Sequence, residues 1–160
     1  MKSEELTEKI LNRVVYYLQG AFEVQKDLLI DHLNELFEEE SELQEAKVIE
    51  KYCKALDKLH KETEKIKKAE SSKELNKAVK DLITAPNEQI KSLAKSRIVE
   101  LITDTAENIV KPLINNLSKY SGDYMVEDSV YELYHELSIS KIVDFSLEEV
   151  LSKNKEELER

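Results

Sequence analysis

The spacing of apolar residues is what most constrains this chain, because they recur at steps of three and four along most of its 160 residues. Such spacing puts apolar side chains on one face of an α-helix, and that face must pack against other elements. Nowhere do β-branched and aromatic residues alternate strictly between turn residues, as they do in half-buried strands. The sequence therefore predicts an all-α fold.

Local signals place the first two helices. Ser3 is a suitable N-cap for a helix that runs to about residue 39, and Gly20 within it predicts a kink or a close helix contact. Ser41 is the next candidate N-cap, and the helix after it extends to about residue 69. The apolar seam of this second helix has heptad spacing and consists of Ile49, Tyr52, Leu56, Leu59, Thr63 and Ile66.

Capping signals and prolines divide the middle of the chain. The sequence Ser71-Ser72-Lys73-Glu74 has the pattern of a capping box, with Ser71 as the cap of a short helix. Pro86 then suits the first turn of a long helix that reaches about residue 120. Pro112 is expected to kink that helix, because its ring removes one backbone hydrogen bond.

The C-terminal third begins after Gly122, which suits a left-handed C-cap. A helix to about residue 137 is expected there, and a second capping box at Ser146 predicts a last short helix. We thus expect an antiparallel bundle of three long helices plus two or three short ones. Residues 1–145 would form a single helical-bundle domain, and residues 146–160 a short C-terminal helix with a polar tail. An elongated coiled-coil dimer through the seam around Leu56 and Leu59 is the alternative.

Composition narrows the class of protein. The chain carries 34 acidic and 24 basic side chains, a net charge of −10, and no apolar stretch that could cross a bilayer. Its N-terminus lacks the apolar core of a signal peptide, and one cysteine cannot form an internal disulfide, so we expect a cytoplasmic, intracellular protein that is not secreted. Two glycines in the whole chain argue against phosphate-cradling loops.

A lysine ridge follows one face of the second helix. Residues 41–80 hold 11 basic and 8 acidic side chains, whereas residues 123–160 hold 4 basic and 11 acidic ones. An acid four residues before a lysine stabilises a helix, and Glu50–Lys54, Asp57–Lys61 and Glu64–Lys68 are expected to pair in this way. The lysine ridge includes Lys54, Lys58, Lys61 and Lys65. Because several of its lysines are expected to pair with acids, a solvated helix face is favoured over nucleic-acid binding.

Catalytic and metal-binding patterns are weak. Asp57 and His60, like Glu132 and His135, stand three residues apart, which is the spacing of the Glu-x-x-His ligands in four-helix di-iron proteins. Asp57 and His60 flank the apolar seam instead of lying along it, so surface histidines are favoured. Cys53 fits a half-buried apolar role. We expect no catalytic residue, no cofactor and no metal.

Aromatic residues give the best candidates for partner binding. Tyrosine is enriched at protein interfaces. The apolar run of residues 142–151, within an acidic segment, either covers one end of the bundle or binds a groove of a partner. The candidates are Tyr124, Tyr131, Tyr134 and Phe145. The sequence thus favours a non-enzymatic protein–protein interaction or assembly module, with an acidic inhibitor or adaptor on a basic partner as a variant. The partner would be another protein, with a homodimer left open. The alternatives are a four-helix bundle that binds a metal or small ligand, and nucleic-acid binding through the lysine ridge of residues 47–68.

Overall fold

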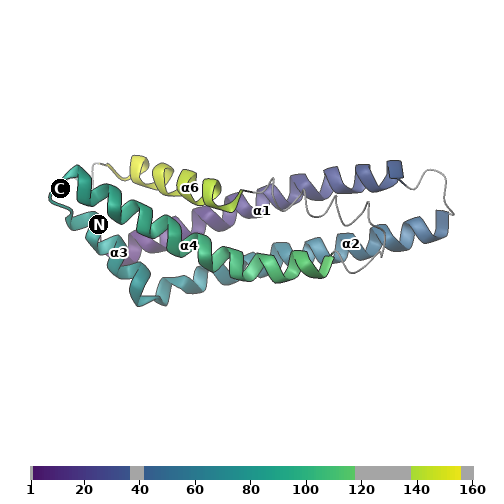
Figure 1. Ribbon diagram of the computed structural model, residues 1–160, viewed down its shortest axis with the longest axis horizontal. Coiled ribbons are helices and arrows are strands. Elements are labelled where there is room, and N and C mark those ends of the chain that lie inside the picture. Colours follow the sequence, from purple (N-terminus) through teal and green to yellow (C-terminus); the bar gives the residue numbers. More distant parts are fainter. Residues whose placement is uncertain (1, 37–41, 118–137, 156–160) are drawn as a thin grey trace.

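The computed structural model describes residues 2–36, 42–117 and 138–155, and all the secondary structure in these ranges is helical (Figure 1). The all-α prediction is therefore confirmed. The helix expected to end near residue 137, with Tyr124, Tyr131 and Tyr134, lies outside the described residues.

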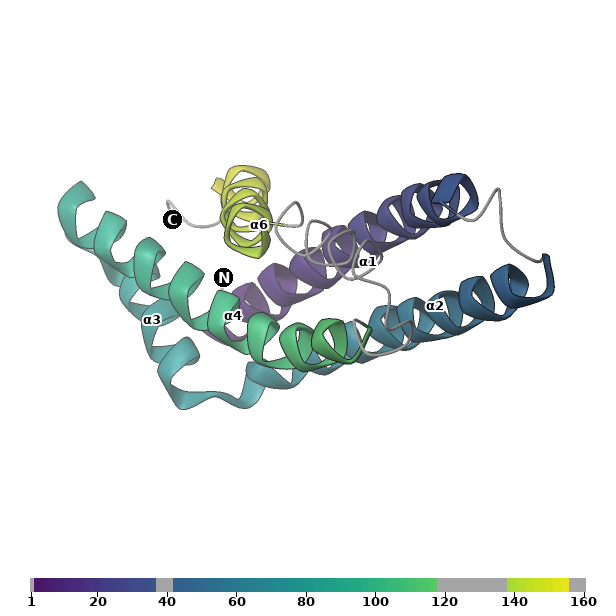
Figure 2. The ribbon, with the colours of Figure 1, turned by 45° about the vertical axis from the view of Figure 1, so that its right-hand side comes forward.

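The elements are α1 (Ser3–Leu36), α2 (Glu42–Glu62), the 3-10 helix η1 (Thr63–Ser71), α3 (Lys73–Thr84), α4 (Glu88–Leu117) and α6 (Ile139–Lys153). The molecule is elongated, and Figures 1 and 2 show α1 and α2 side by side and running in opposite directions, while α4 follows η1 and α2. The shorter α6 packs on α1 and α4 and crosses α1, since Figure 2 shows α6 nearly end-on. Pro112 lies inside α4, which continues to Leu117.

The core is built from the faces that the periodicity selects. Each helix contributes buried residues at steps of three and four, as expected for amphipathic helices in a packed protein. The α1 part of the core comprises Leu6, Ile10, Leu11, Val14, Val15, Leu18 and Phe22. In the second helical segment Leu56, Leu59 and Ile66 are buried with Thr63. This part of the heptad seam is covered by the chain's own helices, so it is not the exposed seam that the coiled-coil alternative requires.

The second helix changes type part of the way along. We predicted one helix to about residue 69, but it becomes a 3-10 helix at Thr63. Such long 3-10 runs are uncommon, because their hydrogen-bond geometry is poorer than that of an α-helix. Here Thr63, Ile66 and Ala69 follow one another at steps of three, which is the 3-10 repeat. Thr63 and Ile66 are fully buried and Ala69 packs on the core, so three residues per turn keep one face inward.

The starts of α1, α3 and α4 differ from the expected ones. Ser3 is the first helical residue of α1 and not its N-cap, because the helical hydrogen bonds already begin with Leu6 N–H donating to the Lys2 carbonyl at 3.2 Å. Ser72, not Ser71, is the N-cap of α3, and its hydroxyl accepts a hydrogen bond from the Leu75 N–H at 3.3 Å. The end of η1 uses the backbone up to Ser71, which moves the cap one residue along. Asn87 caps α4 by accepting from the Ile90 N–H at 3.0 Å, so Pro86 precedes the helix and is not in its first turn.

The C-terminal helix begins earlier than predicted. It starts at Ile139, and Ser146 is a buried residue inside it whose hydroxyl donates to the Ile142 carbonyl at 2.7 Å. Because Val143 and Leu147 are buried against the rest of the core, packing holds α6 continuous through the expected capping box. The boundary that we expected after residue 145 thus falls inside a helix.

Gly20 does not mark a close helix contact. A Cβ added to this glycine would meet no atom within 4 Å outside its own helix turn, and Gly20 is exposed. The close contact expected at this position is therefore absent within the described chain.

Candidate partner-binding surface

Three aromatic rings from two helices meet at the surface where α6 lies on α1. The rings of Tyr16 and Tyr17 are 5.4 Å apart and those of Tyr17 and Phe145 are 5.3 Å apart, both pairs in edge-to-face geometry. Tyr16 is 63% exposed and Phe145 is 59% exposed. We call Tyr16, Tyr17 and Phe145 the aromatic cluster. Large exposed aromatic groups of this kind are typical of interaction sites.

The positions of these rings follow from the helical repeat. On α1, Val14, Val15 and Leu18 face the core, so Tyr17 lies at the boundary and Tyr16 points outward. On α6 the buried residues nearest to Phe145 are Val143, Ser146 and Leu147, and Phe145 is on the opposite side of the helix.

Charged groups hold the cluster in place. The Tyr17 hydroxyl donates to Glu149, which also accepts from Lys153 Nζ at 2.9 Å and lies 3.6 Å from Arg13 Nη2. The Arg13 guanidinium stands 5.7 Å from the centre of the Tyr16 ring and 5.9 Å from that of Tyr17, within cation–π range. Glu149 therefore joins α6 to the first half of α1.

The titration of this pair reflects their hydrogen bond. Donation from Tyr17, with further help from Lys153 and Arg13, lowers the pKa of Glu149. The same bond to Glu149 is the main cause that raises the pKa of Tyr17. Both shifts favour a charged carboxylate beside a neutral phenol.

An open groove of about 540 Å³ adjoins the cluster. It is lined by Lys9, Asn12, Arg13, Tyr16, Val150, Lys153 and Asn154. The cationic groups are already engaged, since Arg13 and Lys153 contact Glu149 and Lys9 donates to the Asn154 side chain at 3.0 Å. The groove therefore gives the aromatic cluster a polar rim.

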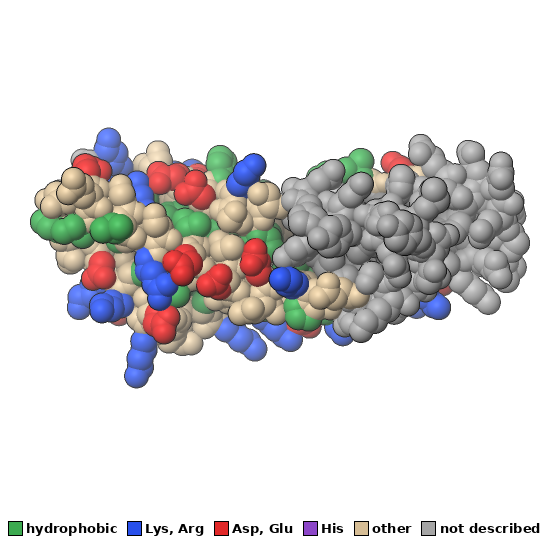
Figure 3. Space-filling model, in the orientation of Figure 1, with side chains coloured by type: hydrophobic (Ala, Val, Ile, Leu, Met, Phe, Trp, Pro, Cys, Tyr) green, Lys and Arg blue, Asp and Glu red, His purple; other side chains and the backbone are tan. Residues whose placement is uncertain are grey.

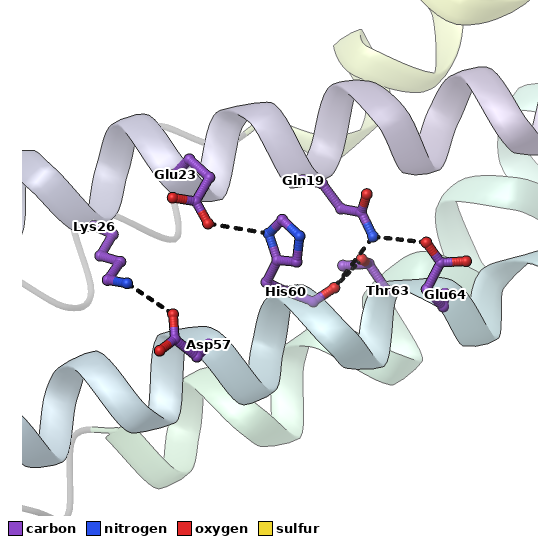
Figure 4. Close-up of polar contacts among 7 residues, drawn as sticks. All are labelled: Gln19, Glu23, Lys26, Asp57, His60, Thr63 and Glu64. Atoms are coloured by element: carbon purple, nitrogen blue, oxygen red, sulfur yellow. Dashed lines mark hydrogen bonds and ion pairs between the residues drawn. The ribbon is translucent and has the colours of Figure 1, made fainter.

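A row of polar contacts joins α1 to the second helical segment (Figure 4). Lys26 Nζ lies 2.7 Å from Asp57 Oδ1, and this bond raises the pKa of Lys26. The Gln19 amide donates to Glu64 at 2.9 Å. Asp57 thus pairs across helices and not with Lys61 as predicted, because a lysine on the neighbouring helix is within reach of its carboxylate.

His60 belongs to the same row. Its Nδ1 is 3.3 Å from Glu23 Oε1, within ion-pair distance but outside hydrogen-bond geometry (Figure 4). The described residues contain no group of three or more His, Cys, Asp or Glu placed to hold a metal ion. Glu132 and His135, the other half of the di-iron pattern, lie outside the described residues. Cys53 is a half-buried free thiol, as expected.

The lysine ridge is exposed and partly paired. Lys54 Nζ is 3.0 Å from Glu50, the predicted pair, while Lys65 contacts Glu62 and thereby lowers the pKa of that glutamate. Lys58 and Lys61 are exposed. Glu64 pairs with Lys67 at 2.9 Å instead of with Lys68, because the switch to a 3-10 helix brings residues three apart onto the same side.

A second apolar patch lies where α3 meets α4. Leu93 is 71% exposed, and with Ile90 it borders an open groove of about 270 Å³ next to Pro86. Figure 3 shows apolar side chains at that end of the molecule, and acidic and basic side chains interspersed over the described part of the same face.

Sequence reasoning found part of this surface. Phe145, a predicted partner-binding residue, is exposed, whereas the tyrosines predicted with it are outside the described residues. It did not select Val24 and Leu28, which are both more than half exposed on α1. The signal that identifies them is a regular step of four residues, from Tyr16 to Gly20, Val24 and Leu28.

Comparison with known proteins finds no matching family model, no matching curated protein and no matching solved structure. Among the described helices, none has a run of apolar sequence long enough to cross a bilayer.

Proposed function

We propose that this chain is a non-enzymatic protein–protein interaction or assembly module, an antiparallel helical bundle that binds a protein partner through the aromatic cluster. The observation that carries the proposal is that Tyr16 and Phe145 stay more than half exposed although two helices hold them in fixed positions. Exposed aromatic side chains with a polar rim are the usual anchors of protein interfaces.

The rigidity of the cluster supports this function. Tyr17 is held by Phe145 on one side and Glu149 on the other, and Arg13 lies near two of the rings. Side chains fixed before binding lose little conformational entropy in a complex, so more of the contact energy contributes to affinity.

The alternative functions have less support among the described residues. A metal-binding bundle needs ligands that converge, whereas Asp57 and His60 each contact a side chain of α1. Nucleic-acid binding needs free basic groups and stacking rings, whereas Lys54 and Lys65 of the ridge contact glutamates.

Photocrosslinking tests the proposal directly. The chain would be expressed in its native source with p-benzoylphenylalanine at position 145, at position 16, or at the exposed control position Lys80 on α3. We expect a discrete protein adduct from positions 145 and 16, and none from position 80.

A second substitution checks that the adduct depends on the cluster. Tyr16→Ser should reduce the adduct from position 145 by about tenfold, as expected for an interface anchor, whereas Leu93→Ser on the other apolar patch should leave it unchanged. Equal adducts from all three positions, or none from any, would overturn the proposed function.

A further inference from the structure

We propose that the partner of this surface is a second copy of the chain, bound through an antiparallel contact between the two α1 helices. The inference rests on the proposed function and names its partner. It starts from a row of exposed residues on α1, here called the α1 stripe, which consists of Tyr16, Gly20, Val24 and Leu28.

The α1 stripe is a continuous surface. Residues four apart on an α-helix are neighbours that rotate by about 40° per step, so the stripe covers one side of α1 over about 18 Å. Val24 is 59% exposed and Leu28 is 55% exposed, although the opposite side of α1 buries Leu18 and Phe22. Apolar residues therefore lie on two sides of this part of α1. Within the described chain, only one of these sides is buried against other helices.

Gly20 adds a steric argument. Glycine in the middle of a helix costs about 1 kcal/mol relative to alanine, and no neighbour in the described chain requires its small size. A second helix packed on the stripe does use it, because the missing side chain leaves room for a bulky residue of the partner.

The charges that flank the stripe select its occupant. Lys9 and Arg13 precede it and Asp31 follows it, while Asp27 lies within its length. Arg13 is one third exposed beside Glu149 of its own chain, and its five N–H donors leave room for a second carboxylate. Arg13 and Asp31 are eighteen residues apart, about five helical turns, so they project from the same side of α1. The stripe is thus flanked by basic residues at its N-terminal end and by an acidic residue at its C-terminal end. When two copies run in opposite directions, each basic end therefore meets an acidic end.

An antiparallel pairing of two copies matches the four stripe residues and the charges at its two ends. With the two-fold axis on the exposed side of α1, at the level of residue 22, Arg13 faces Asp31 of the second copy, and Tyr16 faces Leu28. Gly20 then faces Val24, so the smallest residue meets a branched one. A contact of this kind is isologous, and each match occurs twice. In a parallel pairing Arg13 would face Arg13 and Asp31 would face Asp31, which is repulsive.

Sedimentation velocity of the purified full chain tests this proposal. A contact along one helix is smaller than a standard interface, so we expect reversible dimerisation with a Kd on the order of micromolar to tens of micromolar. Leu28→Ser, at an exposed position where the fold is not at risk, should weaken the dimer by about tenfold.

A charge reversal tests the register. Asp31→Lys should weaken the dimer by about tenfold, because it places a cation opposite Arg13 of the second copy in both symmetric pairs. The matched control is Asp27→Lys, at an exposed acid of the same helix that faces no cation in this register, and it should leave the Kd close to that of the wild type. Circular dichroism of each variant verifies that it is folded.

The outcomes separate this inference from the proposed function. A wild-type chain that stays monomeric up to about 200 µM, or an Asp31→Lys variant that dimerises as strongly as Asp27→Lys, overturns self-pairing. If position 16 then crosslinks to a protein other than this chain, the interaction module stands with a different partner. If it crosslinks to nothing, both proposals fail.

Discussion

At the scale of single residues, Glu149 connects more groups than any other side chain of the candidate surface. Three side chains of two helices approach its carboxylate: Arg13 and Tyr17 from α1, and Lys153 from α6. Because these contacts require the charged form, they hold the pKa of Glu149 below its ordinary value. A group with a lowered folded pKa stabilises the fold above its unfolded pKa, and this contribution is lost as the pH falls through the folded pKa.

Replacing Glu149 with glutamine should therefore lower the free energy of unfolding at pH 7 and make it less dependent on pH between about pH 5 and pH 3. Urea unfolding across a pH series measures both effects. The matched control is Asp144→Asn, an exposed acid on the same helix. If the two variants keep the same pH dependence as the wild type, the contacts of Glu149 do not contribute to stability.

At the scale of elements, the junction between η1 and α3 is held by hydrogen bonds of Ser72 and Asn76, whereas the sequence pattern predicted Ser71 as the cap of α3. The Ser72 N–H donates to the Ala69 carbonyl at 2.9 Å while the Ser72 hydroxyl accepts from the Leu75 N–H. Asn76 of α3 reaches back and donates to the Glu70 carbonyl at 2.8 Å. One serine thus ends one helix and starts the next.

Adjacent serines at this junction offer a matched pair of variants. Ser72→Ala should cost about 1 kcal/mol of stability, because it removes the N-cap of α3. Ser71→Ala should cost less than about 0.5 kcal/mol, because the exposed Ser71 hydroxyl donates only to the Lys68 carbonyl. Chemical denaturation of the two variants checks the difference, and the opposite order would show that Ser71 is the cap.

At the scale of the whole molecule, α6 is part of the core. Val143 and Leu147 are fully buried, and α6 contacts both α1 and α4. An element that shares its buried surface with two others is expected to unfold together with them.

Leu147→Ala should consequently lower the free energy of unfolding by about 2–5 kcal/mol and keep a single transition. Leu93→Ala, at an exposed position, should change it by less than about 0.5 kcal/mol. Circular dichroism and tyrosine fluorescence follow the transition, since the chain has no tryptophan. Separate transitions by the two probes would mean that α6 is an independent appendage.

The amino-acid sequence by itself determined the fold class and most of the buried faces. A repeat of three and four residues is set by the backbone hydrogen bonds of one helix, so Val14, Leu18, Leu56 and Leu59 could be placed inward without knowing their neighbours. It also indicated Phe145 as a candidate partner-binding residue, because Phe145 belongs to an apolar run within an acidic segment.

Only the tertiary structure decided how these helices combine. Asp57 pairs with Lys26, thirty-one residues away, and the rings of Tyr17 and Phe145 meet across 128 residues of sequence. No local pattern encodes such contacts, because they depend on which helix lies alongside. Packing likewise extended α6 through Ser146, where a local capping signal was outweighed by the burial of a continuous apolar face.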